Sequence, residues 1–214
     1  MAHPKDIVIQ YFDGQLPDPL AGAASDTIKT AVVALETKGT HPRRGKLVEL
    51  AISLVETRRQ PAQFVRVLDK GHWFADPEES LPESYTELTG LSEEMLAGQS
   101  IDRDRAANML KEAKLIIAYD AGNARPFLER EIPGLEDKIF ACARNQVDWT
   151  ERGCYCRMLQ YLARDHKWWF DSLRADVQVA ALIKLLSETV PEDEPSYLQE
   201  LSERANEPLI MVEA

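Results

Sequence analysis

An apolar run, AVVAL (31–35), ends at the acid Glu36 and is followed by a turn-type stretch, TKGTHP. If this run is a strand, Ala34 and Glu36 point to the same face, because side chains alternate with a period of two. A carboxylate at both positions would form a ready-made cation site, but position 34 carries only a methyl group. On its own, the run is either half of a carboxylate pair or an ordinary strand end.

The elements that must position this acid can be read from the hydrophobic pattern. Turn-rich stretches separate three apolar runs, which predicts an antiparallel meander over 30–36, 46–56 and 63–69. Strands and helices alternate further along the chain, with strands expected at 114–120 and 138–147 and helices at 92–98, 102–113, 122–132, 157–166 and 172–188. This order predicts an α/β fold with a mixed sheet, part antiparallel and part parallel, flanked by helices.

The composition bounds the class of protein. The chain has 214 residues, of which 44% are hydrophobic and 29% are charged, enough for one large domain with a full core. No apolar run reaches the length of about eighteen residues that a membrane helix needs, and the N-terminus lacks a signal-peptide pattern, so we expect a cytoplasmic protein. The formal net charge of −11 argues against a strong non-specific grip on nucleic acid.

The two ends of the chain differ from its middle. Residues 1–28 show no sustained period and are interpreted as an N-terminal arm with one short strand at 6–11. Residues 188–214 hold eight acids and one base, and we interpret them as a solvated acidic extension. The alternative for this extension is a docking segment for a basic protein partner. The main domain is therefore expected over residues 29–187.

Four segments within this domain resemble the DnaQ-like 3'-5' exonucleases, the DEDD group of the ribonuclease-H-like fold. Ala34-Leu35-Glu36-Thr37-Lys38-Gly39 is similar to the first motif of the family, Asp-x-Glu-Thr-x-Gly. The three other matches follow in the family's order: ELTGLSEEMLAGQSID (87–102), LIIAYDAGNARPFLE (115–129) and VDW (147–149) through YLARDHKWWFDSLRADVQVAALIKLL (161–186). The resemblance implies a ribonuclease-H-like domain.

The resemblance also implies a chemistry that this chain only partly retains. In the family, four carboxylates hold two divalent ions, one to activate the attacking water and one to stabilise the leaving oxygen. Glu36 and Asp176 keep acids at two of these positions, whereas the other two fall on Ala34 and Ala124. The general-base histidine of one branch falls on Asp171. We therefore expect an inactive site without a cofactor, or Mg²⁺ or Mn²⁺ if the site functions.

Three functions remain open at this point. The first is an inactive exonuclease relative kept as a nucleic-acid-binding or assembly subunit, with single-stranded DNA or RNA as its partner. The second is an active exonuclease whose metal site is rebuilt from Glu36, Asp120, Asp171 and Asp176. The third is a scaffold that binds proteins only. A homodimer is compatible with all three.

Several other side chains are of types that could bind nucleic acid or a metal. In the resembling fold, the loop after the first strand lies near the substrate groove, so Arg43, Arg44 and Lys46 are predicted either to contact phosphates or to form a solvated turn. The aromatic run 168–170 is expected to pack in the core. His72 and His166 have no ligand-like neighbours in the sequence and are assigned no role.

Overall fold

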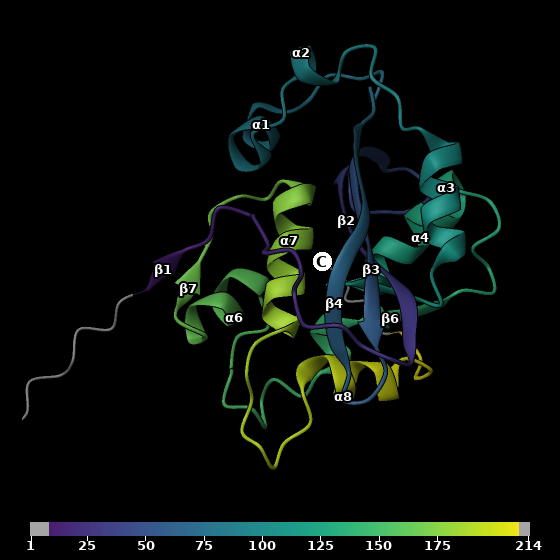
Figure 1. Cartoon of the computed structure of the whole chain (residues 1–214). Coiled ribbons are helices and arrows are strands. Elements are labelled where there is room, and N and C mark those ends of the chain that lie inside the picture. The colour runs from purple at the N-terminus through teal and green to yellow at the C-terminus, as the bar shows by residue number, and fades with distance from the viewer. Residues whose placement is uncertain (1–8, 210–214) are drawn as a thin grey trace, which may run out of the picture.

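The structure is a computed structural model of the chain, and it describes residues 9–209. A five-stranded sheet in the order β4-β3-β2-β5-β6 forms its centre (Figure 1). The first three strands form the antiparallel meander, and β5 and β6 run parallel to β2. The bounds are β2 Thr27–Lys38, β3 Lys46–Arg58, β4 Gln63–Phe74, β5 Leu115–Ala118 and β6 Ile139–Cys142. The expected mixed α/β sheet is therefore confirmed.

Helices cover both faces of the sheet. Figure 1 shows α3 (Arg103–Glu112) and α4 (Ala121–Glu131) on one side, and α6 (Leu159–Asp165) and α7 (Ala175–Leu186) on the other. The shorter helices are α1 (Glu83–Thr89) and α2 (Glu93–Leu96) above the sheet, and α5 (Ala143–Gln146) directly after β6. None of the described helices is long and apolar enough to span a membrane.

Strand alternation divides the core into two layers. In β2, Val33 packs with the α3 and α4 layer, whereas its neighbour Val32 packs with the α6 and α7 layer. Ala34 is a partly buried member of the second layer. Glu36 lies on the same face, where a side chain of α7 contacts it. The expectation that Ala34 and Glu36 share a face is confirmed.

The ends of some strands differ from the sequence prediction. The strand expected over 138–147 ends at Cys142, because the chain turns there into the short helix α5. The third strand of the meander does not stop near residue 69 but continues to Phe74. This extension carries His72 into the sheet opposite Ala51 of β3.

Both ends of the described chain pack on the domain. In the N-terminal arm, β1 (Gln10–Tyr11) pairs with β7 (Trp168–Trp169). Of the strand expected at 6–11, residue 9 is not in a strand, and residues 6–8 lie outside the described residues. The solvated interpretation of 188–214 is wrong for its middle, because α8 (Tyr197–Arg204) buries Tyr197, Leu198 and Leu201 in the core. The aromatic run is confirmed as core at Trp168 and Phe170, which are both 3% exposed.

Candidate functional site

The acid of the first motif, Glu36, lies near the end of β2, where it is partly buried and faces α7. The side-chain amide of Gln178 donates to its Oε1 at 2.7 Å. Burial raises the pKa of Glu36 to about 7, and the nearby Glu49 carboxylate adds to this effect while the Gln178 hydrogen bond opposes it. The Glu36 carboxyl therefore keeps its proton to a higher pH than an ordinary glutamate does.

A second acid, Glu49, lies opposite Glu36 in the β2–β3 register and is fully buried. Its Oε1 is 2.7 Å from His72 Nε2 and accepts from Arg174 Nε at 2.8 Å. Its Oε2 accepts from the backbone N–H of Ala175 at 3.0 Å. Burial alone would raise the pKa of Glu49, but the bonds from His72, Ala175 and Arg174 outweigh it and lower the pKa. Glu49 therefore stays ionised and ties the start of α7 to β3 and β4.

His72 connects this buried acid to Asp176, the acid of the third motif. The Nδ1 atom of His72 is 3.8 Å from Asp176 Oδ2, and both side chains are partly open to solvent. Among the described residues, Glu49, His72 and Asp176 are the one set of three metal-ligand-type side chains whose atoms lie within 4.8 Å of one another. The prediction that His72 has no ligand-like neighbours is therefore wrong, because two acids lie beside it.

The other acids considered for a rebuilt site have different partners. Asp120 caps α4, accepting from Asn123 N at 3.3 Å and Nδ2 at 2.9 Å, and it pairs with Arg144 Nη1 at 2.9 Å. Asp171 is exposed and accepts from the hydroxyl of Tyr11 at 3.3 Å. The described residues contain no metal-ligand group built from three of the acids Glu36, Asp120, Asp171 and Asp176. Each of these two acids thus has a protein partner of its own, and their role as helpers of a metal site stays a prediction.

The methyl groups at the two remaining motif positions are in ordinary apolar surroundings. Ala34 lies opposite Ala51 of β3, and Ala124 of α4 is 7% exposed and packs in the α3 and α4 layer. Neither can donate an oxygen to a cation. Together with the bonded state of Glu36 and Glu49, this donor set does not fit a pair of Mg²⁺ ions, which require several free oxygen ligands in near-octahedral geometry.

The basic residues predicted to contact phosphates lie on the turn that joins β2 to β3. Backbone bonds from Arg44 and Gly45 to the His41 carbonyl, at 2.9 and 2.7 Å, close this turn. Gly45 is required there, since a Cβ would come within 2.3 Å of the Gly39 oxygen. Arg43, Arg44 and Lys46 are all exposed. Their role in nucleic-acid binding stays a prediction.

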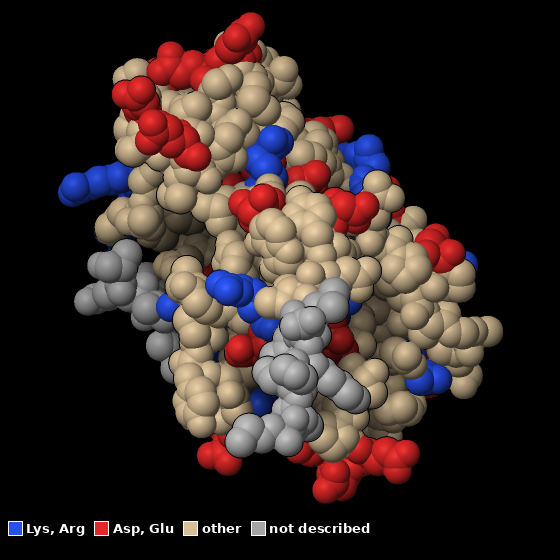
Figure 2. Space-filling model, turned by 90° about the vertical axis from the view of Figure 1, so that its left-hand side faces the viewer, with Lys and Arg blue, Asp and Glu red and all other residues tan. Residues whose placement is uncertain are grey.

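Charge is spread unevenly over the surface. Figure 2 shows acidic side chains gathered over α1 and α2 at the top and along the bottom edge of this face, with basic side chains scattered singly between them. The face therefore offers no continuous basic stripe for a nucleic-acid backbone. Any phosphate contact must rely on a small local group of cations.

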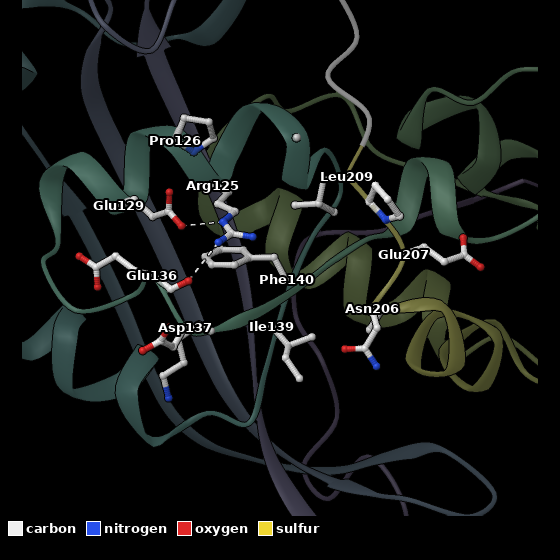
Figure 3. Close-up of a pocket in the computed structure, with 14 residues that line it drawn as sticks. Arg125, Pro126, Glu129, Glu136, Asp137, Ile139, Phe140, Asn206, Glu207 and Leu209 are labelled. Atoms are coloured by element: carbon white, nitrogen blue, oxygen red, sulfur yellow. Dashed lines mark hydrogen bonds and ion pairs between the residues drawn. The ribbon is translucent and has the colours of Figure 1, made fainter.

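A cavity of about 630 Å³ lies apart from these acids, between α4, β6 and the chain after α8 (Figure 3). Arg125 stacks on the Phe140 ring at 5.2 Å there and bonds to Glu129 and to the Glu136 carbonyl. None of the residues predicted to bind metal or nucleic acid lines this cavity. Its arginine already has protein partners, so the cavity does not extend the candidate site.

Comparison with solved structures identifies similar folds. Exonuclease I from E. coli in complex with a dT13 oligonucleotide matches with a TM-score of 0.59 at 15% identity, over 75% of this chain and 40% of that chain. The apo form of exonuclease I matches with a TM-score of 0.55 at 14% identity, over 75% and 41%. The chain thus spans about two fifths of the length of exonuclease I. No family model and no curated protein matches the sequence. At this identity the likeness shows the fold alone: the chain has the ribonuclease-H-like fold of an exonuclease.

Proposed function

We propose that the protein is a catalytically inactive relative of the 3'-5' exonucleases that binds single-stranded nucleic acid without cleaving it. One observation carries this proposal. The acids left beside the first motif are bonded to protein donors, Glu36 to Gln178 and Glu49 to Arg174. These donors supply the hydrogen bonds and the positive charge that cations would otherwise supply to buried carboxylates.

Nucleic-acid binding is supported by the fold and by the exposed turn. Structures of E. coli exonuclease I include complexes with dT13 and dA13 oligonucleotides. In this chain, Arg43, Arg44 and Lys46 are solvent-exposed at the end of the strand that carries Glu36. Three phosphate contacts predict weak binding with a shallow salt dependence, a log–log slope of about −2 for single strands.

The decisive experiment combines a nuclease assay with a binding assay. Labelled single-stranded DNA and RNA are incubated with the purified full chain in Mg²⁺ and in Mn²⁺, and binding is followed by fluorescence anisotropy at low and physiological salt. We expect no shortening of either strand, and binding that weakens with salt. Shortening from the 3' end that Glu36→Gln abolishes would disprove the inactive reading.

A matched pair of variants tests the binding surface. Replacing Arg43 and Arg44 by serine removes two exposed cations from the β2–β3 turn, and we expect at least about a fivefold loss of affinity. The control removes the same charge at the opposite end of β3 by replacing Arg59 and Arg66, which pair with Asp26 and Glu56. If neither nucleic acid binds to the parent protein, the protein-binding scaffold becomes the better explanation.

A further inference from the structure

His72 faces a pocket beside the candidate site. The pocket has a volume of about 390 Å³ and lies between β3, β4, α7 and the arm that follows β1. Its polar lining includes Asp13, Lys70, His72 and Asp176. An imidazole and two carboxylates therefore share one solvent-accessible space, whereas Glu49 lies buried behind the imidazole.

The buried acid determines which nitrogen of His72 is free. The Oε1 atom of Glu49 already accepts from Arg174 Nε at 2.8 Å, so it is an acceptor toward the Nε2 atom of His72 2.7 Å away, and Nε2 carries the proton. In the neutral imidazole, Nδ1 is then an unprotonated nitrogen with a lone pair. Nδ1 is also the atom that faces Asp176. Metal-binding histidines commonly donate the N–H of their other ring nitrogen to a carboxylate, a backbone carbonyl or a water, and Glu49 is such a partner for Nε2.

The spacing between His72 and Asp176 suits an ion between them. Their closest atoms, Nδ1 and Oδ2, are 3.8 Å apart, too far for a direct hydrogen bond. Two ligands that each lie about 2.0–2.2 Å from a tetrahedral metal are separated by about 3.4 Å, so a small side-chain shift closes the geometry. The Asp176 side chain is 50% exposed and free to make that shift.

The ligand types select the metal. Mg²⁺ prefers oxygen ligands only, whereas an imidazole nitrogen beside a carboxylate suits Zn²⁺, Ni²⁺ or Cu²⁺. We propose that His72 Nδ1 and Asp176 bind one late first-row transition-metal ion in this pocket, with Glu49 holding the imidazole in the ligating tautomer. Water molecules complete the coordination. This inference does not depend on the proposed function, because it concerns metal binding and not cleavage.

Calorimetric titration of the chelator-treated full chain with Zn²⁺ and with Mg²⁺ tests the proposal. We expect one Zn²⁺ site and much weaker Mg²⁺ binding. His72→Gln keeps an N–H donor toward Glu49 but removes the ligand, and Asp176→Asn removes the second ligand. Each variant should weaken Zn²⁺ binding by about tenfold or more. Thermal melting without metal establishes that both variants are folded.

Matched controls separate this site from adventitious surface binding. His41→Gln and Asp137→Asn remove an exposed imidazole and an exposed carboxylate elsewhere, and neither should change Zn²⁺ binding. A long-range ¹H–¹⁵N spectrum should show the His72 ring protonated at Nε2, with the Nδ1 resonance shifting as Zn²⁺ is added. Zn²⁺ binding that survives His72→Gln, Mg²⁺ binding of equal strength, no stoichiometric Zn²⁺ site, or the opposite tautomer would each overturn the proposal.

Discussion

Glu36 and Glu49 lie opposite each other in the β2–β3 register, yet their pKa values are shifted in opposite directions. Glu36 receives one neutral amide donor, from Gln178, and its pKa is raised to about 7. Glu49 is fully buried but receives three donors, one of them the Arg174 guanidinium, and its pKa is lowered. The comparison teaches that the number and charge of the donors, more than burial, decide whether a buried carboxylate is ionised.

The two environments also support each other. Two adjacent ionised carboxylates repel, so a firm charge on Glu49 favours the protonated form of Glu36. One guanidinium then neutralises the charge that remains, since Arg174 bonds directly to Glu49. The sheet can bury both acids without a divalent ion.

The largest effect on stability is expected from Glu49→Gln, because Glu49 is the acid with the greater number of hydrogen-bond donors. The variant leaves the Arg174 guanidinium without its anion and buries an amide NH₂ where only donors point. Removing one partner of a buried ion pair costs about 3–5 kcal/mol, and we expect about 2–4 kcal/mol here because the Arg174 side chain is 24% exposed. Urea unfolding at neutral pH measures the loss.

Glu56→Gln is the matched control for this variant. Glu56 lies on the same strand and pairs with Arg66, but its side chain is 25% exposed and its partner's is 56% exposed. We expect a loss below about 1 kcal/mol. Equal losses for the two variants would show that the Glu49 environment is not special.

Glu36→Gln tests whether the raised pKa of Glu36 makes the stability of the protein depend on pH. The folded pKa of about 7 is above the ordinary value of 4.5, so the folded state binds the proton more tightly. Wild-type stability should therefore fall as pH rises from about 4.5 through about 7. The glutamine mimics the protonated acid, so the variant should lose this fall and be more stable at pH 8 by on the order of 1–3 kcal/mol.

The pH experiment has its own control. Glu87→Gln changes an exposed acid of α1 and should leave the stability profile unchanged between pH 4 and pH 8. Unfolding curves at several pH values, recorded for the wild type and both variants, supply the comparison. If Glu36→Gln keeps the wild-type slope, Glu36 is ionised throughout and the contrast with Glu49 fails.

The sequence alone predicts the sheet and the shared face of Ala34 and Glu36, because both follow from local alternation. It does not predict the partnership of Glu49 with His72, which depends on the register of β3 against β4. That register shifts twice, between Leu54 and Val55 and between Glu56 and Thr57. A single sequence carries no local signal for such shifts. The donor His72 was missed for this reason, whereas Arg174 and Ala175 reach Glu49 from the start of α7, more than a hundred residues further along the chain.

Helix α8 was missed for a different reason. Its apolar positions, Tyr197, Leu198 and Leu201, follow a helical spacing, but they lie in the most acidic stretch of the chain. Arg152, whose side chain is only 9% exposed, pairs with Glu194 and Glu200 and so neutralises part of that charge. This cation comes from more than forty residues earlier in the chain. Composition read locally therefore overestimates how solvated the segment is.

Asp120→Asn is expected to have the smallest effect on stability. Asp120, like Glu49, has an arginine partner, but its side chain is more exposed to solvent than that of Glu49. The asparagine can still cap α4 and loses only the ion pair with Arg144, whose side chain is 32% exposed. We expect a loss below about 1 kcal/mol, and about 1 kcal/mol more for Asp120→Ala, which also removes the cap. Urea unfolding with and without Mn²⁺ measures both. Because Asp120 acts through its cap and its ion pair, Mn²⁺ should not distinguish the variants. Stabilisation of the wild type by Mn²⁺ that both variants lose would instead assign this acid to a metal site.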